Sequence, residues 1–95
     1  MIVSFADKRT AAIFAGQAVK ELPPQIQRRA KSKLQSLDAA IRLEDLRIPP
    51  GNRLESLKGN RSGQHSLRIN DQWRLCFIWK DDDAWEAEIV DYHKG

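Results

Sequence analysis

Three side chains that can do chemistry stand together near the end of the 95-residue chain, namely Asp91, Tyr92 and His93. Histidine exchanges a proton near neutral pH because its unperturbed pKa is about 6.5. A neighbouring carboxylate or phenol can orient it or bind a substrate group. By themselves, the three residues fit either a reactive site or an aromatic residue that closes the core between two polar neighbours. Which of these two interpretations holds depends on the secondary-structure elements that position the three residues.

Three runs in the last third of the chain alternate polar and apolar residues, at 64–69, 73–79 and 85–90. Period-two alternation over such lengths indicates strands with one buried face. We therefore predict an antiparallel meander whose last strand leads directly into Asp91.

The first loop of this meander, at residues 70–72, sets the register of the first two strands. A three-residue loop there pairs Leu67 with Leu75 and His65 with Phe77, which places the large apolar side chains on one face. His65 is thereby assigned to packing and given no catalytic role.

The second loop is predicted at 81–83. It pairs Trp79 with Trp85 and Leu75 with Ile89, so that the core face stays apolar. The parity assigns all three tryptophans to the core: Trp73, Trp79 and Trp85.

The opposite face of the meander collects polar residues around two arginines. Arg68 lies opposite Arg74, and the same face carries Cys76, Glu88, Val90 and Tyr92. Like charges facing each other across strands destabilise by up to about 1 kcal/mol. Either an anion bridges the two arginines, or Glu88 neutralises Arg74 in a surface network.

The amino-terminal half predicts a short strand and two helices. Residues 2–5 favour a strand, Asp7 is a suitable N-cap for a short helix that ends near Gly16, and Pro24 can open a second helix. An apolar stripe follows at helical spacing: Ile26, Ala30, Leu34, Leu37 and Ile41. The basic residues of this helix form either a solvated surface or a phosphate-binding face: Arg28, Arg29, Lys31 and Lys33.

Two shorter elements precede the meander. Residues 43–46 fit one more helical turn, and residues 52–63 fit a short strand followed by a glycine-bounded loop. Together these elements predict a single α+β domain over residues 1–95, in which helices pack on one face of a small antiparallel sheet.

Composition narrows the classes of function. Residues 1–80 carry 15 Lys/Arg against 7 Asp/Glu, whereas residues 81–95 carry 1 against 6. The basic body suits either a surface that meets phosphate or a merely solubilising surface. A lone cysteine, Cys76, excludes an internal disulfide and a Cys-based metal site and is expected to be buried. The absence of a long apolar run or a signal-peptide pattern predicts a cytoplasmic protein.

Three stretches resemble the HigB branch of the RelE-type toxins of bacterial toxin–antitoxin pairs. They are RLESLKGNR at 53–61, QHSLRINDQWR at 64–74 and EIVDYH at 88–93. The resemblance covers nearly the whole chain. It implies a small α+β fold, a ribosome-dependent mRNA endonuclease that needs no metal or cofactor, and a HigA-like helix-turn-helix antitoxin as partner.

The resemblance also implies roles for the polar face. Asp91, Tyr92 and His93 match the catalytic positions at the family's carboxyl end, and Arg74 matches its motif arginine. His93 would act as the principal acid/base, Arg74 would stabilise charge that develops on the phosphate, and Asp91 would orient one of these two. Tyr92 would stack on a base or bind the phosphate.

The loop before the meander departs from the family. Some members carry a histidine where this chain has Glu55, so a scheme with two histidines does not carry over directly. Glu55 is instead a candidate second proton acceptor. Basic residues of this loop and of the next strand are expected to contact RNA, with Lys58 also helping Arg74: Arg53, Lys58, Arg61 and Arg68.

Two other classes of function remain open. The scaffold also suits a non-nuclease toxin similar to the ParE-like gyrase inhibitors, which need no acid or base at the carboxyl end. A module that only binds ribosomal RNA or an antitoxin is the third alternative.

Overall fold

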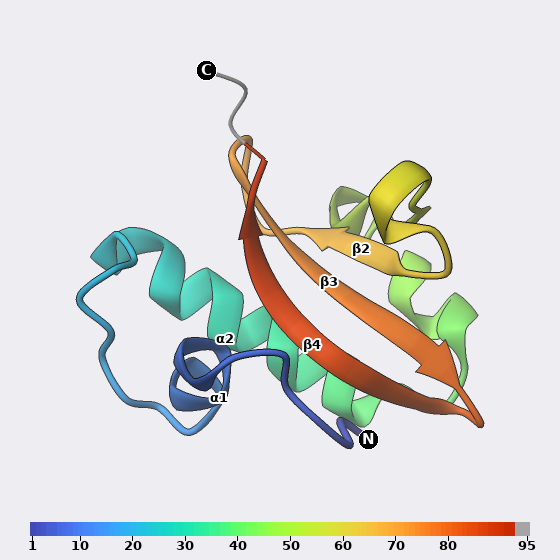
Figure 1. Cartoon of the computed structure of the whole chain (residues 1–95), viewed down its shortest axis with the longest axis horizontal. Helices are drawn as coiled ribbons and strands as arrows, with labels where there is room; N and C mark the ends of the chain where they lie inside the picture. Colours follow the sequence, from blue (N-terminus) through green and yellow to red (C-terminus); the bar gives the residue numbers. More distant parts are fainter. Residues whose placement is uncertain (93–95) are drawn as a thin grey trace.

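The computed structural model describes residues 1–92 and confirms the α+β class. Four antiparallel strands form one sheet in the order β1-β2-β3-β4, and α2 crosses one face of it (Figure 1). The helices are α1 (Lys8–Phe14) and α2 (Pro24–Ala39), and the strands are β1 (Glu55–Ser56), β2 (His65–Arg68), β3 (Trp73–Lys80) and β4 (Asp83–Asp91). Three 3₁₀ turns lie between α2 and β2, namely η1 (Leu43–Arg47), η2 (Pro50–Asn52) and η3 (Gly59–Arg61).

Both helices begin where the sequence predicts. The Asp7 carboxylate accepts a 2.8 Å hydrogen bond from the Thr10 amide at the start of α1, and Pro24 opens α2. The apolar stripe of α2 is buried as far as Leu37. Its last predicted member, Ile41, is 76% exposed, because α2 ends at Ala39 and the following residue is already extended.

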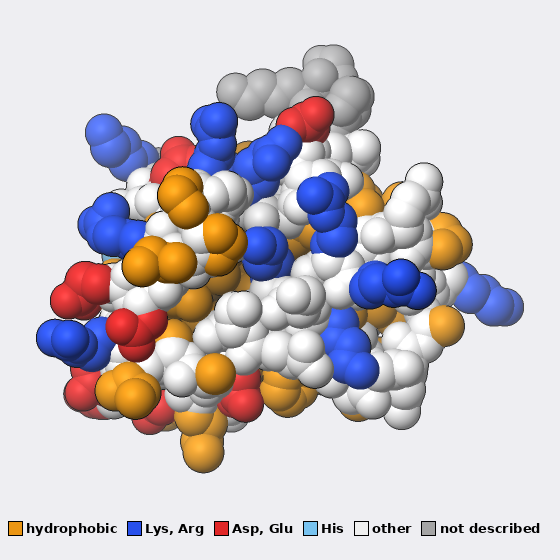
Figure 2. Space-filling model, turned by 180° about the vertical axis from the view of Figure 1, so that it is seen from behind, with side chains coloured by type: hydrophobic (Ala, Val, Ile, Leu, Met, Phe, Trp, Pro, Cys, Tyr) orange, Lys and Arg blue, Asp and Glu red, His pale blue; other side chains and the backbone are white. Residues whose placement is uncertain are grey.

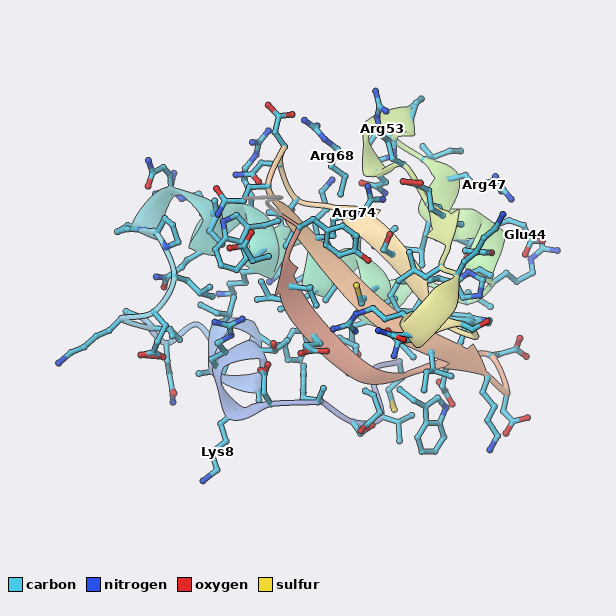
Figure 3. The ribbon with its side chains drawn as sticks, turned by 45° about the horizontal axis from the view of Figure 1, so that its top comes forward. Lys8, Glu44, Arg47, Arg53, Arg68 and Arg74 are labelled. Atoms are coloured by element: carbon cyan, nitrogen blue, oxygen red, sulfur yellow. The ribbon has the colours of Figure 1, made fainter. Side chains whose placement is uncertain are left out.

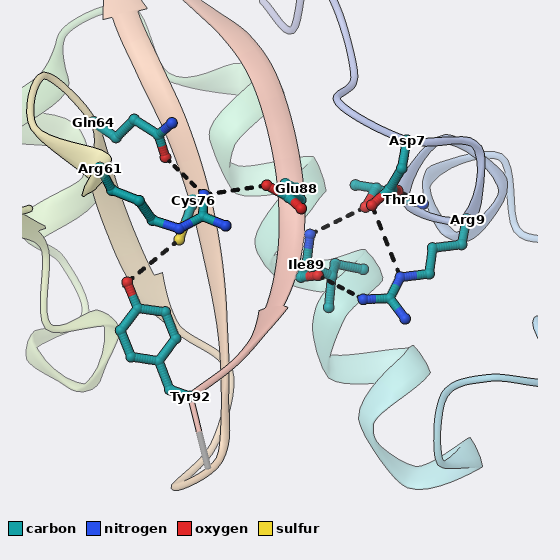
Figure 4. A network of polar contacts seen from close by, with 9 residues as sticks. All are labelled: Asp7, Arg9, Thr10, Arg61, Gln64, Cys76, Glu88, Ile89 and Tyr92. Atoms are coloured by element: carbon teal, nitrogen blue, oxygen red, sulfur yellow. Dashed lines mark hydrogen bonds and ion pairs between the residues drawn. The ribbon is translucent and has the colours of Figure 1, made fainter. Parts of the chain in front are cut away.

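The segment before α1 does not form the predicted strand. Ile2 and Phe5 make only isolated parallel bridges, to Ala84 and Ala87 of β4. Further along the same edge, Ile89 donates its amide to the Thr10 hydroxyl and accepts from the Arg9 guanidinium, each at 3.0 Å (Figure 4). The amino-terminal segment and α1 therefore cover the edge of β4, which would otherwise present unpaired backbone groups.

The register between β2 and β3 is confirmed. Leu67 pairs with Leu75, His65 with Phe77, and Arg68 with Arg74. The loop that sets it is held by a side chain, because the Asn70 carboxamide oxygen accepts the amides of residues 72 and 73, both at 2.8 Å.

The register between β3 and β4 is correct at one end and wrong at the other. Leu75 pairs with Ile89 as predicted, but Trp79 pairs with Ala84 rather than with Trp85. The turn has two residues at positive φ, Asp81 and Asp82, which is the tight hairpin that matches strand twist. A β-bulge at Glu86 (φ 54°) absorbs the extra residue.

This slip changes the position of one tryptophan. Trp85 pairs with Ile78 and is half-buried instead of lying in the core, and its indole donates to the Lys80 carbonyl at 3.1 Å. Trp73 is buried and Trp79 packs against the core, as expected.

Charge is unevenly distributed over the surface. Seen from the side on which α2 lies, Lys and Arg side chains spread over the upper and middle surface, and acidic side chains gather at the lower left (Figure 2). Within residues 1–92, no helix is long and apolar enough to cross a membrane.

Candidate functional site

Arg74 lies at the centre of the sheet face opposite the core, and three oxygens hold its guanidinium. Its Nε donates to the Ser66 hydroxyl at 2.8 Å. Its Nη2 donates to the Arg53 carbonyl at 2.8 Å and pairs with the Glu55 carboxylate at 2.8 Å. The side chain is only 14% exposed, so its position is well defined.

The third nitrogen of this guanidinium is Nη1. Among the residues that the structure describes, Nη1 of Arg74 has no hydrogen-bond partner. Guanidinium N–H groups bind phosphate oxygens strongly, because charge-assisted hydrogen bonds are about twice as strong as neutral ones. The chemistry of the group thus fits an anion at Nη1.

The two opposed arginines each have a carboxylate of their own. Arg74 is paired with Glu55 and Arg68 with Asp71 (Figure 3 shows the two arginines on the same side of the molecule). The interpretation that Glu88 neutralises Arg74 is wrong, because Glu88 pairs with another arginine. An anion that bridges Arg68 and Arg74 remains a prediction.

Tyr92 lies beside Arg74, on the face to which the predicted register assigns both residues. The Arg74 guanidinium carbon is 5.8 Å from the centroid of its ring, and the phenol lies 3.7 Å from the Cys76 sulfur (Figure 4). Burial, with the Cys76 contact second, raises the pKa of Tyr92, although the charges of Arg61 and Arg74 act in the opposite direction. The phenol is therefore protonated at neutral pH and can donate a hydrogen bond.

Cys76 is fully buried, as expected for a lone cysteine, but on the polar face. Burial raises the pKa of its thiol. An inert thiol with this pKa fits packing rather than nucleophilic chemistry.

Arg61 joins the loop before β2 to β4. Its guanidinium donates to Gln64 at 3.0 Å and pairs with Glu88 at 3.1 Å (Figure 4). Lys58 and Arg53, by contrast, have exposed side chains that make no ion pair within residues 1–92. Of the four predicted RNA-binding residues, these two are the most accessible cations.

Asp91 does not face Arg74. Asp91 pairs with Trp73 in the sheet, so its side chain has the opposite parity to that of Arg74. The Asp91 carboxylate accepts a hydrogen bond from the side-chain amide of Gln72 at 3.2 Å. The remaining predicted catalytic residue, His93, lies outside the described residues.

Sequence reasoning missed two residues that organise the site. Ser66 binds Arg74, and the backbone carbonyl of Gln72 accepts the Tyr92 amide at 2.6 Å. Ser66 has the same strand parity as Arg68, which is a signal that the sequence carries.

No group of three or more His, Cys, Asp or Glu side chains within residues 1–92 is arranged to hold a metal ion. The described part of the site thus consists of guanidinium groups, carboxylates and a phenol. Such a set binds and polarises anions and transfers protons.

Comparison with known proteins places the chain in a family. Residues 3–93 match the family model of HigB-like toxins, described as RelE-like toxins of type II toxin–antitoxin systems. Toxin HigB-1 of Vibrio cholerae is 42% identical over 95 residues, covering 99% of both chains. Endoribonuclease HigB of Proteus vulgaris is 31% identical over 93 residues, covering 98% of this chain and 100% of the relative.

A solved structure shows the same fold. The YoeB–YefM complex from Staphylococcus aureus contains a chain that matches this one with a TM-score of 0.61 and 19% identity, covering 99% of both chains. A likeness at this identity concerns the fold alone. The family match, by contrast, extends over almost the entire sequence, and the chain therefore belongs to the HigB-like family of RelE-like toxins, each one half of a type II toxin–antitoxin pair.

Proposed function

We propose that this toxin is an endoribonuclease that cleaves translated mRNA on the ribosome. The observation that carries the proposal is the position of Arg74, an arginine held by three oxygens with Nη1 left over, on a face rich in cations. A relative of 31% identity is named Endoribonuclease HigB, which supports the activity.

The reaction is attack of a ribose 2′-oxygen on the adjacent phosphate. A base removes the 2′-hydroxyl proton, a phosphorane forms, and the 5′-oxygen leaves with a proton from an acid. The new bond closes a 2′,3′-cyclic phosphate, and the downstream fragment carries a 5′-hydroxyl. No redox partner or metal is required, because the step only redistributes protons and one phosphoryl bond.

Arg74 would stabilise the additional negative charge of the phosphorane. A preorganised donor of this kind typically contributes about 10²- to 10³-fold in rate when its removal is measured. Tyr92 would bind the same phosphate or stack on a base, because its ring lies beside the guanidinium and unpaired bases stack on aromatic rings. Lys58 would assist from the neighbouring loop.

Proton transfer would rest on His93, with Glu55 as the second acceptor. Histidine suits both proton roles near pH 7. The Glu55 carboxylate lies 2.8 Å from Arg74, so a phosphate bound to Arg74 would come close to it. Asp91 would orient His93 rather than Arg74, since its parity is opposite to that of Arg74.

The substrate and partner follow from the same proposal. Arg53, Lys58, Arg61 and Arg68 would contact the RNA backbone. The cognate antitoxin would be a HigA-like helix-turn-helix protein, and the site of action would be the cytoplasm, where mRNA is translated.

Mapping the 5′ ends of cellular mRNA after expression tests the proposal. The wild type should create new 5′-hydroxyl ends within translated regions, and Arg74→Ala and His93→Ala should reduce them by about 10²-fold or more. Lys8→Ala is the matched control, because Lys8 lies far from Arg74 (Figure 3) and should leave the ends unchanged.

Two outcomes would overturn it. Growth arrest without new mRNA ends would point to a non-nuclease toxin such as a gyrase inhibitor. Loss of cleavage with a chelator that removes transition metals but spares ribosomal Mg²⁺ would contradict the metal-free mechanism.

A further inference from the structure

Three polar side chains among residues 1–92 are buried to 1% exposure or less: Thr10, Asn52 and Ser66. Thr10 holds the edge of β4, and Ser66 holds Arg74. The printed hydrogen bonds of the Asn52 side chain go to Lys33, Leu46 and Ile48, which are not among the residues of the site described above, so that site does not account for its burial. A buried amide is costly unless its hydrogen bonds are made, so its partners indicate what it is for.

The Asn52 amide ties three segments together. Its Nδ2 donates to the carbonyls of Leu46 and Ile48, at 3.1 and 3.2 Å. Its Oδ1 accepts from the Lys33 ammonium, which reaches over from α2. Both amide hydrogens and one oxygen lone pair are therefore used, and the loop after α2 is anchored to the helix through one side chain.

The anchored loop leads directly to Arg74. Arg53, the next residue, is left-handed (φ 46°, ψ 58°), a conformation that a non-glycine residue keeps only when its surroundings hold it. Its amide donates to the Pro50 carbonyl at 3.1 Å, and its own carbonyl accepts from Arg74 at 2.8 Å. Glu55, two residues further on, supplies the carboxylate of Arg74.

We propose that Asn52 is a positioning residue for Arg74, acting through the Arg53 carbonyl, and that Lys33 serves as its anchor rather than as an RNA contact. The inference rests on the proposed function of Arg74. It also corrects the expectation that Lys33 lies on the exposed basic face of α2. The Lys33 side chain is half-buried, and burial, with the charge of Arg29 second, lowers its pKa.

The chain contains a matched control for this idea. Gln27 is also an amide that ties a loop to α2 by three hydrogen bonds, to the amide and carbonyl of Val19 and to the carbonyl of Leu22. That loop does not contact Arg74. Asn52→Ala and Gln27→Ala therefore remove equivalent anchors, and only one of them leads to the site.

The first measurement is independent of activity. In NMR spectra, the Arg74 Nε–H signal reports its hydrogen bond to Ser66. We expect Asn52→Ala to shift this signal and to accelerate its exchange with solvent, and Gln27→Ala to leave it unchanged. Equal behaviour of the two variants would overturn the proposal.

The second measurement is cleavage of mRNA on purified ribosomes. Asn52→Ala should lower the single-turnover rate by about 10- to 100-fold with ribosome binding unchanged, because small misplacements of a catalytic group cost rates of this order. Gln27→Ala should keep the wild-type rate. A loss in binding alone, or equal losses in both variants, would contradict a positioning role.

If Asn52→Ala does not fold, Lys33→Met is used, since it keeps the amide and removes only its anchor. It should shift the Arg74 signal in the same direction, and an unshifted signal would overturn the proposal. A failure of the proposed function of Arg74 would give a different result from a failure of the positioning role of Asn52. Arg74→Ala would then cleave normally, while the Arg74 Nε–H signal of the Asn52 and Lys33 variants would still report the positioning.

Discussion

At the scale of single residues, Arg74 is fixed by three groups that come from two parts of the chain, the segment 53–55 and β2. Ser66 on β2, the Arg53 carbonyl and the Glu55 carboxylate share the hydrogens of Nε and Nη2. Such a guanidinium needs little reorganisation when an anion arrives, which is the condition for electrostatic stabilisation of a transition state. The repulsion between Arg68 and Arg74 is offset because each has its own carboxylate.

His65 should make stability depend on pH. It is half-buried beside Phe77, with ring centroids 6.0 Å apart, and desolvation lowers its pKa. The folded chain therefore favours the neutral ring, while the unfolded chain takes up the proton below about pH 6.5. Stability contributed by the neutral ring is present above pH 6.5 and is lost as the pH falls towards the folded pKa.

Urea unfolding at pH 7.5 and about pH 5.5 checks this expectation. The wild type should lose stability on acidification, and His65→Gln should lose less, because glutamine does not titrate. Ser56→Ala is the control: it removes the hydroxyl 3.4 Å from His65 Nδ1 and keeps the titrating ring. An equal acid-induced loss in His65→Gln and the wild type would contradict the assignment.

At the scale of elements, the hairpin between β3 and β4 combines a tight turn with a bulge. The two-residue turn at Asp81 and Asp82 matches the right-handed twist of the two strands. Compared with a three-residue loop, it shifts the register beside the turn by one residue. The bulge at Glu86 restores the pairing of Leu75 with Ile89, which keeps the apolar side chains of β4 on the core face. As a result, β4 reaches the site in the register that puts Tyr92 beside Arg74.

Asp82→Gly should stabilise the protein. Asp82 is exposed at φ 62°, where a side chain costs about 1–2 kcal/mol in general and somewhat less for Asp. Because glycine also gains freedom in the unfolded chain, we expect a net gain of about 0.5 kcal/mol in the free energy of unfolding.

Asp83→Gly is the control for the same acidic turn. Asp83 lies in β4 and pairs with the amino terminus at 3.3 Å, so this variant should be destabilised. Denaturant unfolding of both variants measures the difference. A destabilised Asp82→Gly would show that the left-handed residue is not strained.

At the scale of the whole molecule, the basic body surrounds a site that is itself largely ion-paired. Arg61, Arg68 and Arg74 all contact carboxylates, whereas Lys58 is exposed and makes no ion pair with any residue from 1 to 92. Sequence-independent attraction to RNA depends on cations that can release counterions from phosphates. Lys58 is therefore a better candidate for this attraction than the paired arginines.

Lys58→Ala should weaken binding to single-stranded RNA and reduce its salt dependence. Loss of one phosphate contact lowers the slope of log K against log salt by about 0.7. Fluorescence anisotropy over a series of salt concentrations measures this slope. Lys8→Ala removes the same charge far from the site (Figure 3) and should leave the slope unchanged; equal changes in both variants would argue for a diffuse effect of net charge.

The sequence alone determined those features in which one residue constrains its near neighbours. The start of α2 follows from Pro24 and the apolar spacing behind it, and the β2–β3 register follows because a slip by one residue would expose the core face. The predicted pairing of Leu75 with Ile89 between β3 and β4 placed Tyr92 on the same face as Arg74. The family motifs added the hypothesis of catalytic residues. One of these, His93, lies outside the residues that the structure describes.

Tertiary structure decided what depends on segments far apart in the chain. The alternation of polar and apolar residues in β3 and β4 fits a three-residue loop as well as a two-residue turn followed by a bulge. The sequence pattern therefore did not reveal the position of Trp85. Nor did it reveal that Glu55, rather than Glu88, neutralises Arg74, or that the buried amide of Asn52 supports the Arg53 carbonyl. These contacts form only when β1, α2 and β3 pack together, because their free energies depend on geometry that no local pattern encodes.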